Sequence, residues 1–412
     1  MPPFPACRAC GAPLTRTLVD LGLSPLANSY VRPDKAGIPD PRYPLHARVC
    51  DACLLVQVDD VVPAAEIFSA DYAYFSSFSD SWLAHCRDWA ENATRRYGLG
   101  PETLVLEIAS NDGYLLQYFV AEGIPVLGVD PAANAASVAE AKGVPTRVDF
   151  FGERLARELV AEGQRPALIT AANVLAHVPD INDFLRGVAV LLSGEAVFAV
   201  EFPHLLNLIR SVQFDTIYHE HYSYLSLIAV ERIAAQAGLR VCDVETLPTH
   251  GGSLRVHLCL AGADRPEGPG VARVRAQERE AALDRPEGYA GFGPRCERLR
   301  DDLLAFLREA NARGETVAAY GAAAKGNTLL NYAGVGTDLI AFCVDRNPAK
   351  QDTLLPGSRI PVRPPEALAA ARPDWVLILP WNIKTEVMGQ LADLRAAGTR
   401  FVTAVPRLTI ED

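Results

Sequence analysis

The feature that most restricts the fold of this chain is an alternation of short apolar runs with segments of helical periodicity. Four runs between residues 103 and 202 have the composition of buried parallel strands: TLVLEIA, VLGVD, ALITAA and AVFAVEF. The helical segments between them each end near a glycine that suits a helix C-terminus. Strand and helix repeated in this way predict a doubly wound α/β sheet.

The alternation starts again near the C-terminus, where TVAAYG, DLIAFCVD, WVLILP and RFVTAVP have strand character. Between the two blocks, residues 261–294 are rich in Gly, Pro, Arg and Glu, which indicates a linker with a surface helix. A chain of 412 residues exceeds what one hydrophobic core usually supports. We therefore expect a second α/β domain that is built around its own core.

Two cysteine pairs precede both blocks. Cys7 and Cys10 form one C-x-x-C pair, and Cys50 and Cys53 form the other, in a stretch with Gly and Pro punctuation and little helical periodicity. Each pair can direct two sulfurs at one tetrahedral ion. Four protein ligands leave no open position, so we predict a structural Zn²⁺ site. Four free thiols remain the alternative.

The composition excludes several classes of partner. The net charge is −11 and no Lys/Arg stripe is present, so we expect no nucleic-acid partner. No signal-like start and no run of about 18 apolar residues is found, so we expect no membrane partner. The odd count of nine cysteines suits a reducing compartment. We predict a cytoplasmic protein with a small-molecule ligand and no obligate protein partner.

The loop after the first central strand has the position of a ligand site. Ser110-Asn111-Asp112-Gly113 follows VLEIA, at the sheet edge where helix N-termini meet ligands. Ala109 stands where G-x-G-x-x-G would have its first glycine, which disfavours a dinucleotide. S-adenosylmethionine has no phosphate, and Glu107 can accept a hydrogen bond from its ammonium group. We therefore predict that Glu107, Ala109, Asn111 and Gly113 bind this cofactor.

Later strand ends supply the remaining cofactor candidates. Asp130 follows the second strand and can accept both ribose hydroxyls. Asp149 and Phe150 follow a further strand, expected between VLGVD and ALITAA and counted as the third. They could hold the adenine by a hydrogen bond and a ring face. Asn173 follows ALITAA and is assigned to the same site. A Rossmann-like domain that binds another ligand stays open on these motifs alone.

A reactive cluster lies in Tyr218-His219-Glu220-His221-Tyr222, which holds two of the eight histidines. In an extended segment the two histidines would share one face and the other three side chains the opposite face. Without an obvious third ligand, acid/base chemistry is favoured over metal binding. A cluster that only packs remains the alternative. His177 follows ALITAA, which is the fourth strand along the chain, and should lie at the same ligand edge.

Together these motifs resemble the sugar 3-C-methyltransferases of antibiotic deoxysugar pathways, and the resemblance runs along essentially the whole chain. The matching stretches are the four-cysteine module, Tyr72-Ala-Tyr-Phe-Ser-Ser, Glu107-Ile-Ala-Ser-Asn-Asp-Gly113, Ala172-Asn-Val-Leu-Ala-His177, Tyr218-His-Glu-His-Tyr222, His250-Gly-Gly-Ser-Leu-Arg255 and Gly321-Ala-Ala-Ala-Lys-Gly-Asn327.

The resemblance implies three domains. They are a zinc-binding module over residues 1–70, an S-adenosylmethionine-dependent methyltransferase domain over 71–250 and a Rossmann-like domain over 251–412 that binds the nucleotide of a dTDP-sugar. It also implies which side chains surround the sugar: Tyr72, His177, Tyr218, Glu220 and His221.

Four residues of the last two motifs are assigned to the nucleotide-sugar: Ser253, Arg255, Lys325 and Asn327. Lys325 follows the strand TVAAYG, where a phosphate can meet a cationic side chain and the N–H groups of a helix start. A solvated surface lysine is the alternative.

The chemistry that we predict from the resemblance starts from a 4-keto group, which acidifies the proton on carbon 3 of the sugar. We assign His221 as the base, with Glu220 orienting imidazole or sugar and Tyr72 closing over the substrate. Tyr218 and His177 are the candidates for stabilising the enolate oxygen. The division of labour between His221 and Tyr218 stays open.

Two other functions compete with this prediction. An NAD-dependent nucleotide-sugar oxidoreductase or epimerase could use either α/β domain, although the glycine fingerprint is missing. A non-catalytic zinc-ribbon adaptor could carry an inert Rossmann-like body.

Overall fold

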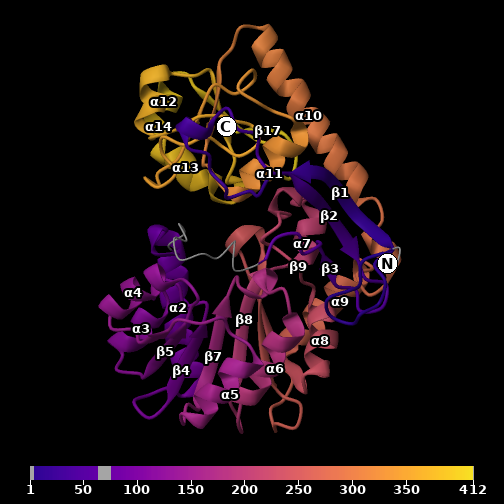
Figure 1. The fold of residues 1–412 in the computed structure, drawn as a ribbon, viewed down its shortest axis with the longest axis vertical. Helices are drawn as coiled ribbons and strands as arrows, with labels where there is room; N and C mark the ends of the chain where they lie inside the picture. Colours follow the sequence, from indigo (N-terminus) through magenta and orange to yellow (C-terminus); the bar gives the residue numbers. More distant parts are fainter. Residues whose placement is uncertain (1–3, 64–75, 412) are drawn as a thin grey trace.

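The computed structural model describes residues 4–63 and 76–411. Three sheets organise the chain, and Figure 1 shows them as an indigo N-terminal module, a purple-to-magenta central domain and an orange-to-yellow C-terminal domain. None of the helices in the described ranges is long and apolar enough to cross a membrane.

The N-terminal module is an antiparallel sheet in the order β1-β2-β3-β9. Its first three strands are β1 (Arg16–Ser24), β2 (Tyr43–Val49) and β3 (Val56–Gln57). The fourth, β9 (Ser223–Tyr224), comes from a segment that follows the central parallel strands in sequence. The module is therefore completed by the two residues that directly follow the Tyr218–Tyr222 motif.

The central domain is built on a seven-stranded sheet in the order β10-β11-β8-β7-β4-β5-β6. Its strands are β4 (Leu104–Ile108), β5 (Val126–Val129), β6 (Thr146–Arg147), β7 (Pro166–Ala172), β8 (Val197–Pro203), β10 (Leu239–Leu247) and β11 (Ser253–Leu260). β11 runs antiparallel to both of its neighbours, β10 and β8, and the other neighbouring pairs of this sheet are parallel. The predicted doubly wound sheet is confirmed, since β4 is followed by β5 and β6 on one side and β7 and β8 on the other.

Helices connect the strands of this sheet. They are α2 (Asp80–Tyr97), α3 (Leu116–Ala121), α4 (Ala133–Ala141), α5 (Glu153–Ala161), α6 (Ile181–Leu191), α7 (Leu205–Arg210) and α8 (Leu227–Gln236). Serine at position 79 starts α2 by accepting from the Trp82 N–H, and Gly98 ends it in a left-handed conformation. Figure 1 places α2 to α4 at one end of the sheet and α8 towards the other.

The central sheet continues past residue 250. Because β11 pairs with both β10 and β8, Leu260 still belongs to it, and strand pairing favours a domain boundary after that residue. The following segment is not the surface linker expected from its composition. Its helix α9 (Pro269–Glu280) packs on β10 and buries Val271, Val274 and Glu278. The Glu278 carboxylate accepts from the N–H groups at the start of α8, which explains why a glutamate is buried there.

The C-terminal domain has a six-stranded sheet in the order β14-β13-β12-β15-β16-β17, and only β17 is antiparallel. Its elements are α10 (Phe292–Ala312), β12 (Val317–Tyr320), α11 (Ala324–Ala333), β13 (Cys343–Val344), β14 (Val362–Arg363), α12 (Glu366–Ala371), β15 (Trp375–Ile378), α13 (Lys384–Gln390), α14 (Ala392–Ala396), β16 (Arg400–Thr403) and β17 (Thr409–Glu411). The predicted second α/β domain is confirmed.

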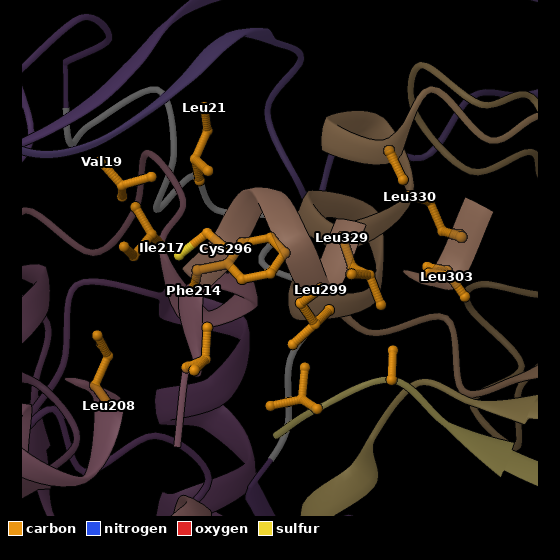
Figure 2. Close-up of a cluster of buried hydrophobic side chains, with 14 of the residues drawn as sticks. Val19, Leu21, Leu208, Phe214, Ile217, Cys296, Leu299, Leu303, Leu329 and Leu330 are labelled. Atoms are coloured by element: carbon orange, nitrogen blue, oxygen red, sulfur yellow. The ribbon is translucent and has the colours of Figure 1, made fainter. Parts of the chain in front are cut away.

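One apolar cluster joins the three units. Figure 2 shows Val19 and Leu21 of β1 with Phe214 and Ile217 of the central chain, and Leu303 of α10 lies in the same cluster. The long helix α10 runs beside β1 in Figure 1 and supplies further members of the cluster. Because packed interiors transmit small displacements, this cluster fixes the residues just before the Tyr218–Tyr222 motif relative to both flanking units.

Truncation of this cluster should destabilise the whole protein. Leu303 is fully buried on α10, so Leu303→Ala should lower the free energy of unfolding by about 2 to 5 kcal/mol. Chemical denaturation followed by circular dichroism measures the loss. Arg308→Ala, at an exposed position of the same helix, is the control and should stay within about 0.5 kcal/mol of the wild type.

Candidate active site

The four predicted zinc ligands lie together. The Sγ atoms of Cys7, Cys10, Cys50 and Cys53 all lie within 4.8 Å of one another. Cys7 and Cys53, and likewise Cys10 and Cys50, have their sulfurs 3.5 Å apart. Four converging sulfurs at this spacing fit a tetrahedral ion with Zn–S distances of about 2.3 Å.

The two cysteine pairs sit in matching turns. The Gly11 N–H donates to the Cys7 carbonyl at 2.8 Å, and the Leu54 N–H donates to the Cys50 carbonyl at 2.9 Å. Gly11 and Leu54 both have positive φ angles, 74° and 64°. Each turn therefore directs its two sulfurs to the same side. Gln57 adds a hydrogen bond from Nε2 to the Cys7 sulfur at 3.1 Å, an outer contact typical of metal sites.

The loop after β4 has a strained backbone. Ala109, Asn111 and Gly113 have φ angles of 60°, 48° and 75°, a region that favours glycine. A Cβ atom on Gly113 would lie 3.2 Å from Val144 and 3.3 Å from Ala139, so glycine is required there. Strained loops of this kind cluster at ligand sites.

Asp130 holds this loop in place. One carboxylate oxygen accepts from the Asn111 N–H and the other from the Ala132 N–H, both at 2.8 Å. Burial raises the pKa of Asp130, and these two hydrogen bonds counteract the effect. A carboxylate oxygen has two lone pairs, so both oxygens keep capacity to accept ribose hydroxyls. Asp345 of the C-terminal domain uses the same geometry, accepting from the N–H groups of Ala322 and Asn347.

Glu107 provides the test of fit for S-adenosylmethionine. Its side chain is fully buried, and burial raises its pKa well above the usual value. Neither carboxylate oxygen makes a hydrogen bond of normal geometry with the residues that the structure describes, although the Tyr114 hydroxyl lies near enough to lower the pKa. A buried carboxylate without its hydrogen bonds is costly. A cationic ammonium group at this strand end would supply them, so the residues present fit the cofactor.

The other predicted cofactor residues lie in different surroundings. Asp149 pairs with Arg154 at 2.7 Å, and Phe150 is 47% exposed. Asn173 has a positive φ of 55°, and its N–H donates to the Glu201 carbonyl at 2.8 Å. The Asn111 side-chain oxygen accepts from the Ser76 N–H, so this amide ties the loop to the 3-10 helix Ser76–Phe78, which precedes α2.

The Tyr218–Tyr222 motif is a turn, and the expectation of an extended segment is wrong. The His221 N–H donates to the Tyr218 carbonyl at 2.9 Å, which reverses the chain direction. The Tyr218 hydroxyl and His221 Nε2 are therefore 2.8 Å apart, with ring centroids 4.0 Å apart. His219 points instead to the N-terminal module, where Nε2 contacts the Pro44 carbonyl at 3.2 Å. The two histidines thus face different parts of the molecule.

Hydrogen bonding assigns the tautomer of His221. Its Nδ1 lies 2.9 Å from the Thr216 carbonyl, which can only accept, so Nδ1 carries the proton. Nε2 is then an acceptor and takes the hydrogen bond from the Tyr218 hydroxyl. Burial lowers the pKa of His221 well below its usual value, and the neighbouring His177 and Lys325 lower it further. The imidazole is therefore neutral, with Nε2 as its acceptor nitrogen.

His177 faces the same group. It lies in the 3-10 helix Leu175–His177, and its ring centroid is 4.6 Å from that of His221 in an edge-to-face arrangement. Its Nδ1 contacts the Glu220 carbonyl at 2.8 Å and therefore carries the proton. Burial lowers the pKa of His177 to about 4. A neutral ring of this tautomer presents Nε2 as an acceptor, which does not suit the predicted donor role towards an enolate oxygen.

Glu220 is held by a residue that the sequence analysis does not assign. The Asn28 side-chain amide donates to both Glu220 carboxylate oxygens at 2.8 Å. Burial raises the pKa of Glu220, whereas the bond from Asn28 and the charge of Lys350 lower it. Asn28 is 192 positions away in sequence and belongs to no recognisable motif, so no local signal indicates this contact.

Lys325 reaches the same cluster from the C-terminal domain. Its Nζ donates to the Asn382 side chain at 2.7 Å and lies 5.0 Å from the centre of the Trp381 ring. Trp381 in turn donates from Nε1 to Asp215 at 2.7 Å. Burial lowers the pKa of Lys325, and the Asp215 carboxylate opposes this effect.

His250 is a second residue without an earlier assignment. It has a positive φ of 54°, and burial followed by the charge of Lys325 lowers its pKa to about 4. Its neighbour Gly251 lies so close to Trp381 that a Cβ atom would be 2.5 Å from the ring. The predicted match at residues 250–255 contained this histidine, so the motif was available as a signal.

The remaining predicted substrate residues are buried in structural contacts. Arg255 pairs with Glu201 at 2.8 Å and Glu245 at 3.2 Å. Asn327 donates to the Ala27 carbonyl at 2.7 Å, and Ser253 donates to the Thr249 carbonyl at 3.0 Å. Arg255 and Ser253 thus make contacts within the central domain. Asn327 links the C-terminal domain to the N-terminal module. Tyr72 lies outside the described residues.

Known proteins match this arrangement along the chain. Family models match three consecutive stretches: a zinc binding domain over residues 7–68, a methyltransferase domain over 83–244 and a C-methyltransferase C-terminal domain over 248–406. C-methyltransferase NovU of Streptomyces niveus is 37% identical over 404 residues, which cover 98% of this chain and 96% of NovU.

Two further comparisons cover only part of the chain. The ubiquinone biosynthesis O-methyltransferase of Methylobacterium sp. (strain 4-46) is 34% identical over 131 residues, covering 30% of this chain and 51% of that enzyme. A solved S-adenosylmethionine-dependent methyltransferase from Clostridium acetobutylicum has a TM-score of 0.36 and 11% identity, covering 45% of this chain and 93% of its own.

The fold and the cofactor loop thus belong to an S-adenosylmethionine-dependent methyltransferase with a zinc-binding module. The chain is a member of the C-methyltransferase family that includes NovU. The predicted family, cofactor and structural zinc are confirmed. This assignment replaces the oxidoreductase and adaptor alternatives. The individual site residues stay predictions.

Metal analysis tests the zinc site. Purified protein should contain about one zinc per chain, because four thiolates fill the coordination sphere. Cys7→Ser should lower zinc content and folded yield more than it lowers activity per folded molecule. Cys296→Ser, which removes a buried thiol outside the cluster, should keep the zinc. Folded, unchelated wild-type protein without zinc would contradict the assignment.

Calorimetry tests the cofactor loop. Asp130→Ala should weaken S-adenosylmethionine binding by about 1 to 3 kcal/mol, since the loop and the ribose both lose an acceptor. Asp345→Ala removes the equivalent contact from the other domain and should leave this affinity unchanged. Equal affinities in the wild type and Asp130→Ala would place the ribose elsewhere.

Proposed function

We propose that this C-methyltransferase acts on carbon 3 of a dTDP-4-keto-6-deoxysugar, through an enolate that a base of the protein generates. The observation that carries the proposal is the pair of Tyr218 and neutral His221, joined at 2.8 Å. Forming a carbon–carbon bond requires a carbon nucleophile, and a sugar C–H bond becomes acidic enough only beside a carbonyl group. A neutral imidazole next to a hydroxyl donor is suited to that deprotonation.

The C3–H bond breaks, the proton passes to Nε2 of His221, and the electron pair is delocalised onto the C4 oxygen. When bound, S-adenosylmethionine would supply the electrophilic methyl group for C3, and its sulfur would keep the electron pair of the broken carbon–sulfur bond and leave as a neutral thioether. For Nε2 to be available, the Tyr218 hydroxyl transfers its hydrogen bond from His221 to the C4 oxygen. One hydroxyl thereby frees the base and stabilises the enolate.

The surrounding residues support these roles. His177 offers Nε2 as an acceptor, which suits a hydroxyl or amino group of the sugar. Glu220 is fixed by Asn28 and reaches its position independently of substrate. Lys325 brings a positive charge that affects both His221 and His250, so it can attract either the developing enolate or a phosphate of the nucleotide. Tyr72 remains assigned to covering the sugar.

The cellular setting is part of the same proposal. All nine cysteines are free thiols in the described structure, and four of them converge on the metal site. This pattern suits a reducing compartment, so we place the enzyme in the cytoplasm with a small-molecule substrate.

Isotope exchange tests the chemistry. His221→Asn should bind both ligands yet lose methyl transfer by about 10² to 10⁴-fold, the usual contribution of a positioned base. It should also lose exchange of the C3 proton with deuterated solvent in the absence of methyl donor. Mass spectrometry of a dTDP-4-keto-6-deoxysugar measures both reactions. Methyl transfer is followed with enzyme and labelled cofactor, and exchange is followed with enzyme in deuterated solvent without the cofactor.

Tyr218→Phe provides the contrast. It removes the donor to the enolate and keeps the imidazole, so both reactions should slow while some exchange survives. If His221→Asn exchanges at the wild-type rate and Tyr218→Phe does not, the tyrosine is the base and the two roles are reversed.

A further inference from the structure

One side chain of the zinc module reaches both parts of the proposed catalytic group. Arg8 stands between the first two zinc ligands, Cys7 and Cys10. Its guanidinium donates from NH1 to the Pro179 carbonyl at 2.8 Å and from NH2 to the Val58 carbonyl at 2.6 Å. Two separate chain segments therefore converge on a single planar donor group.

Both contacts lie next to catalytic positions. Pro179 follows His177 by two residues. On the other side, the Arg8 guanidinium carbon lies 5.2 Å from the ring centre of Tyr222, the residue after His221. The Val58 N–H also donates to the Tyr222 carbonyl at 3.1 Å, so Val58 joins Arg8 to the same turn.

The zinc site fixes Arg8 in turn. The Gln57 side chain donates to the Cys7 sulfur and accepts from the Arg8 N–H at 2.9 Å. Asn182, at the start of α6, donates to the Ala9 carbonyl at 2.9 Å. The Cys7–Cys10 turn is thus tied to the chain just after His177 by two side chains. Arg8 reaches from the turn to Pro179, and Asn182 reaches back to the turn.

We propose that Arg8 is a positioning residue for methyl transfer, which sets the placement of His177 relative to His221 from the zinc turn. The identity of the catalytic pair rests on the proposed function. Zinc then affects catalysis as well as folding. It would fix the Cys7–Cys10 turn, and Arg8 in that turn sets the edge-to-face contact between His177 and His221. Arg8 itself does not touch the reacting atoms.

Arg8→Met tests this inference in the zinc-loaded full chain. The variant keeps the length and apolar contact of the side chain and removes both hydrogen bonds. We expect kcat to fall about 10- to 100-fold, since small misplacements of catalytic groups have effects of that size. The Michaelis constant and the zinc content should not change. Arg8→Lys keeps a cationic donor group and should recover part of kcat.

Hydrogen–deuterium exchange supplies a readout that needs no substrate. Amides of residues 175–182 and 217–224 should exchange faster in Arg8→Met than in the wild type. Arg16→Met is the matched control, because Arg16 lies in the same module and pairs with Asp51 at an exposed position. It should leave kcat and both peptides unchanged.

Three outcomes would overturn the inference: loss of zinc from Arg8→Met, a fall in kcat that Arg8→Lys does not relieve, or exchange in both peptides equal to that of Arg16→Met. A wild-type enzyme that fails to methylate the sugar panel would instead count against the proposed function, while the exchange comparison would still decide whether Arg8 fixes these segments.

Discussion

The proposed active site depends on the hydrogen bond between the Tyr218 hydroxyl and Nε2 of His221, and on the turn that makes this bond possible. The turn has little regular structure of its own and is held from several sides. The N-terminal module contacts it through Asn28, and its last residues continue into β9 of the module's sheet. The C-terminal domain contacts it through Thr328, whose hydroxyl donates to the Ile217 carbonyl at 3.2 Å. The N-terminal module, the central domain and the C-terminal domain therefore all help to fix the positions of Tyr218 and His221.

This arrangement explains why the imidazole of His221 is neutral. Imidazole rings in water titrate near pH 6.5 and would be partly protonated at neutral pH. Here burial, the proximity of a second imidazole and the charge of Lys325 all act against protonation of His221. The Thr216 carbonyl opposes them and fixes the proton on Nδ1. The result is an imidazole that is neutral at physiological pH, as the proposed base must be, with Nε2 held towards the Tyr218 hydroxyl.

Features with a local cause could be predicted from the sequence. The strands of both α/β domains follow from apolar runs bounded by turns, and the zinc ligands follow from spacing within each C-x-x-C pair. The extended form expected for the Tyr218–Tyr222 motif was wrong because alternation describes only an isolated strand. The bond from the His221 N–H to the Tyr218 carbonyl, and the contacts of His219 with the N-terminal module, select a turn.

Features with a distant cause could not be predicted. Arg255 was assigned to the substrate as part of the His250–Arg255 motif, and that role stays a prediction. Its pairs with Glu201 and Glu245 could not be predicted, because they form only when the three strands lie side by side in the sheet. The residues before α10 suggested a linker, although Glu278 among them caps α8. Asn28 had no sequence signal because its contact with Glu220 forms only when the module docks.

The most direct test of the central claim is the protonation state of His221 in the free, zinc-loaded enzyme. Nitrogen-15 NMR of labelled histidine, assigned with His221→Asn and followed against pH, reports both charge and tautomer. The account predicts a neutral ring protonated on Nδ1 that stays neutral as the pH falls through about 6.5, the usual pKa of histidine. A ring that becomes an imidazolium near that pH, or that carries its proton on Nε2, would contradict it.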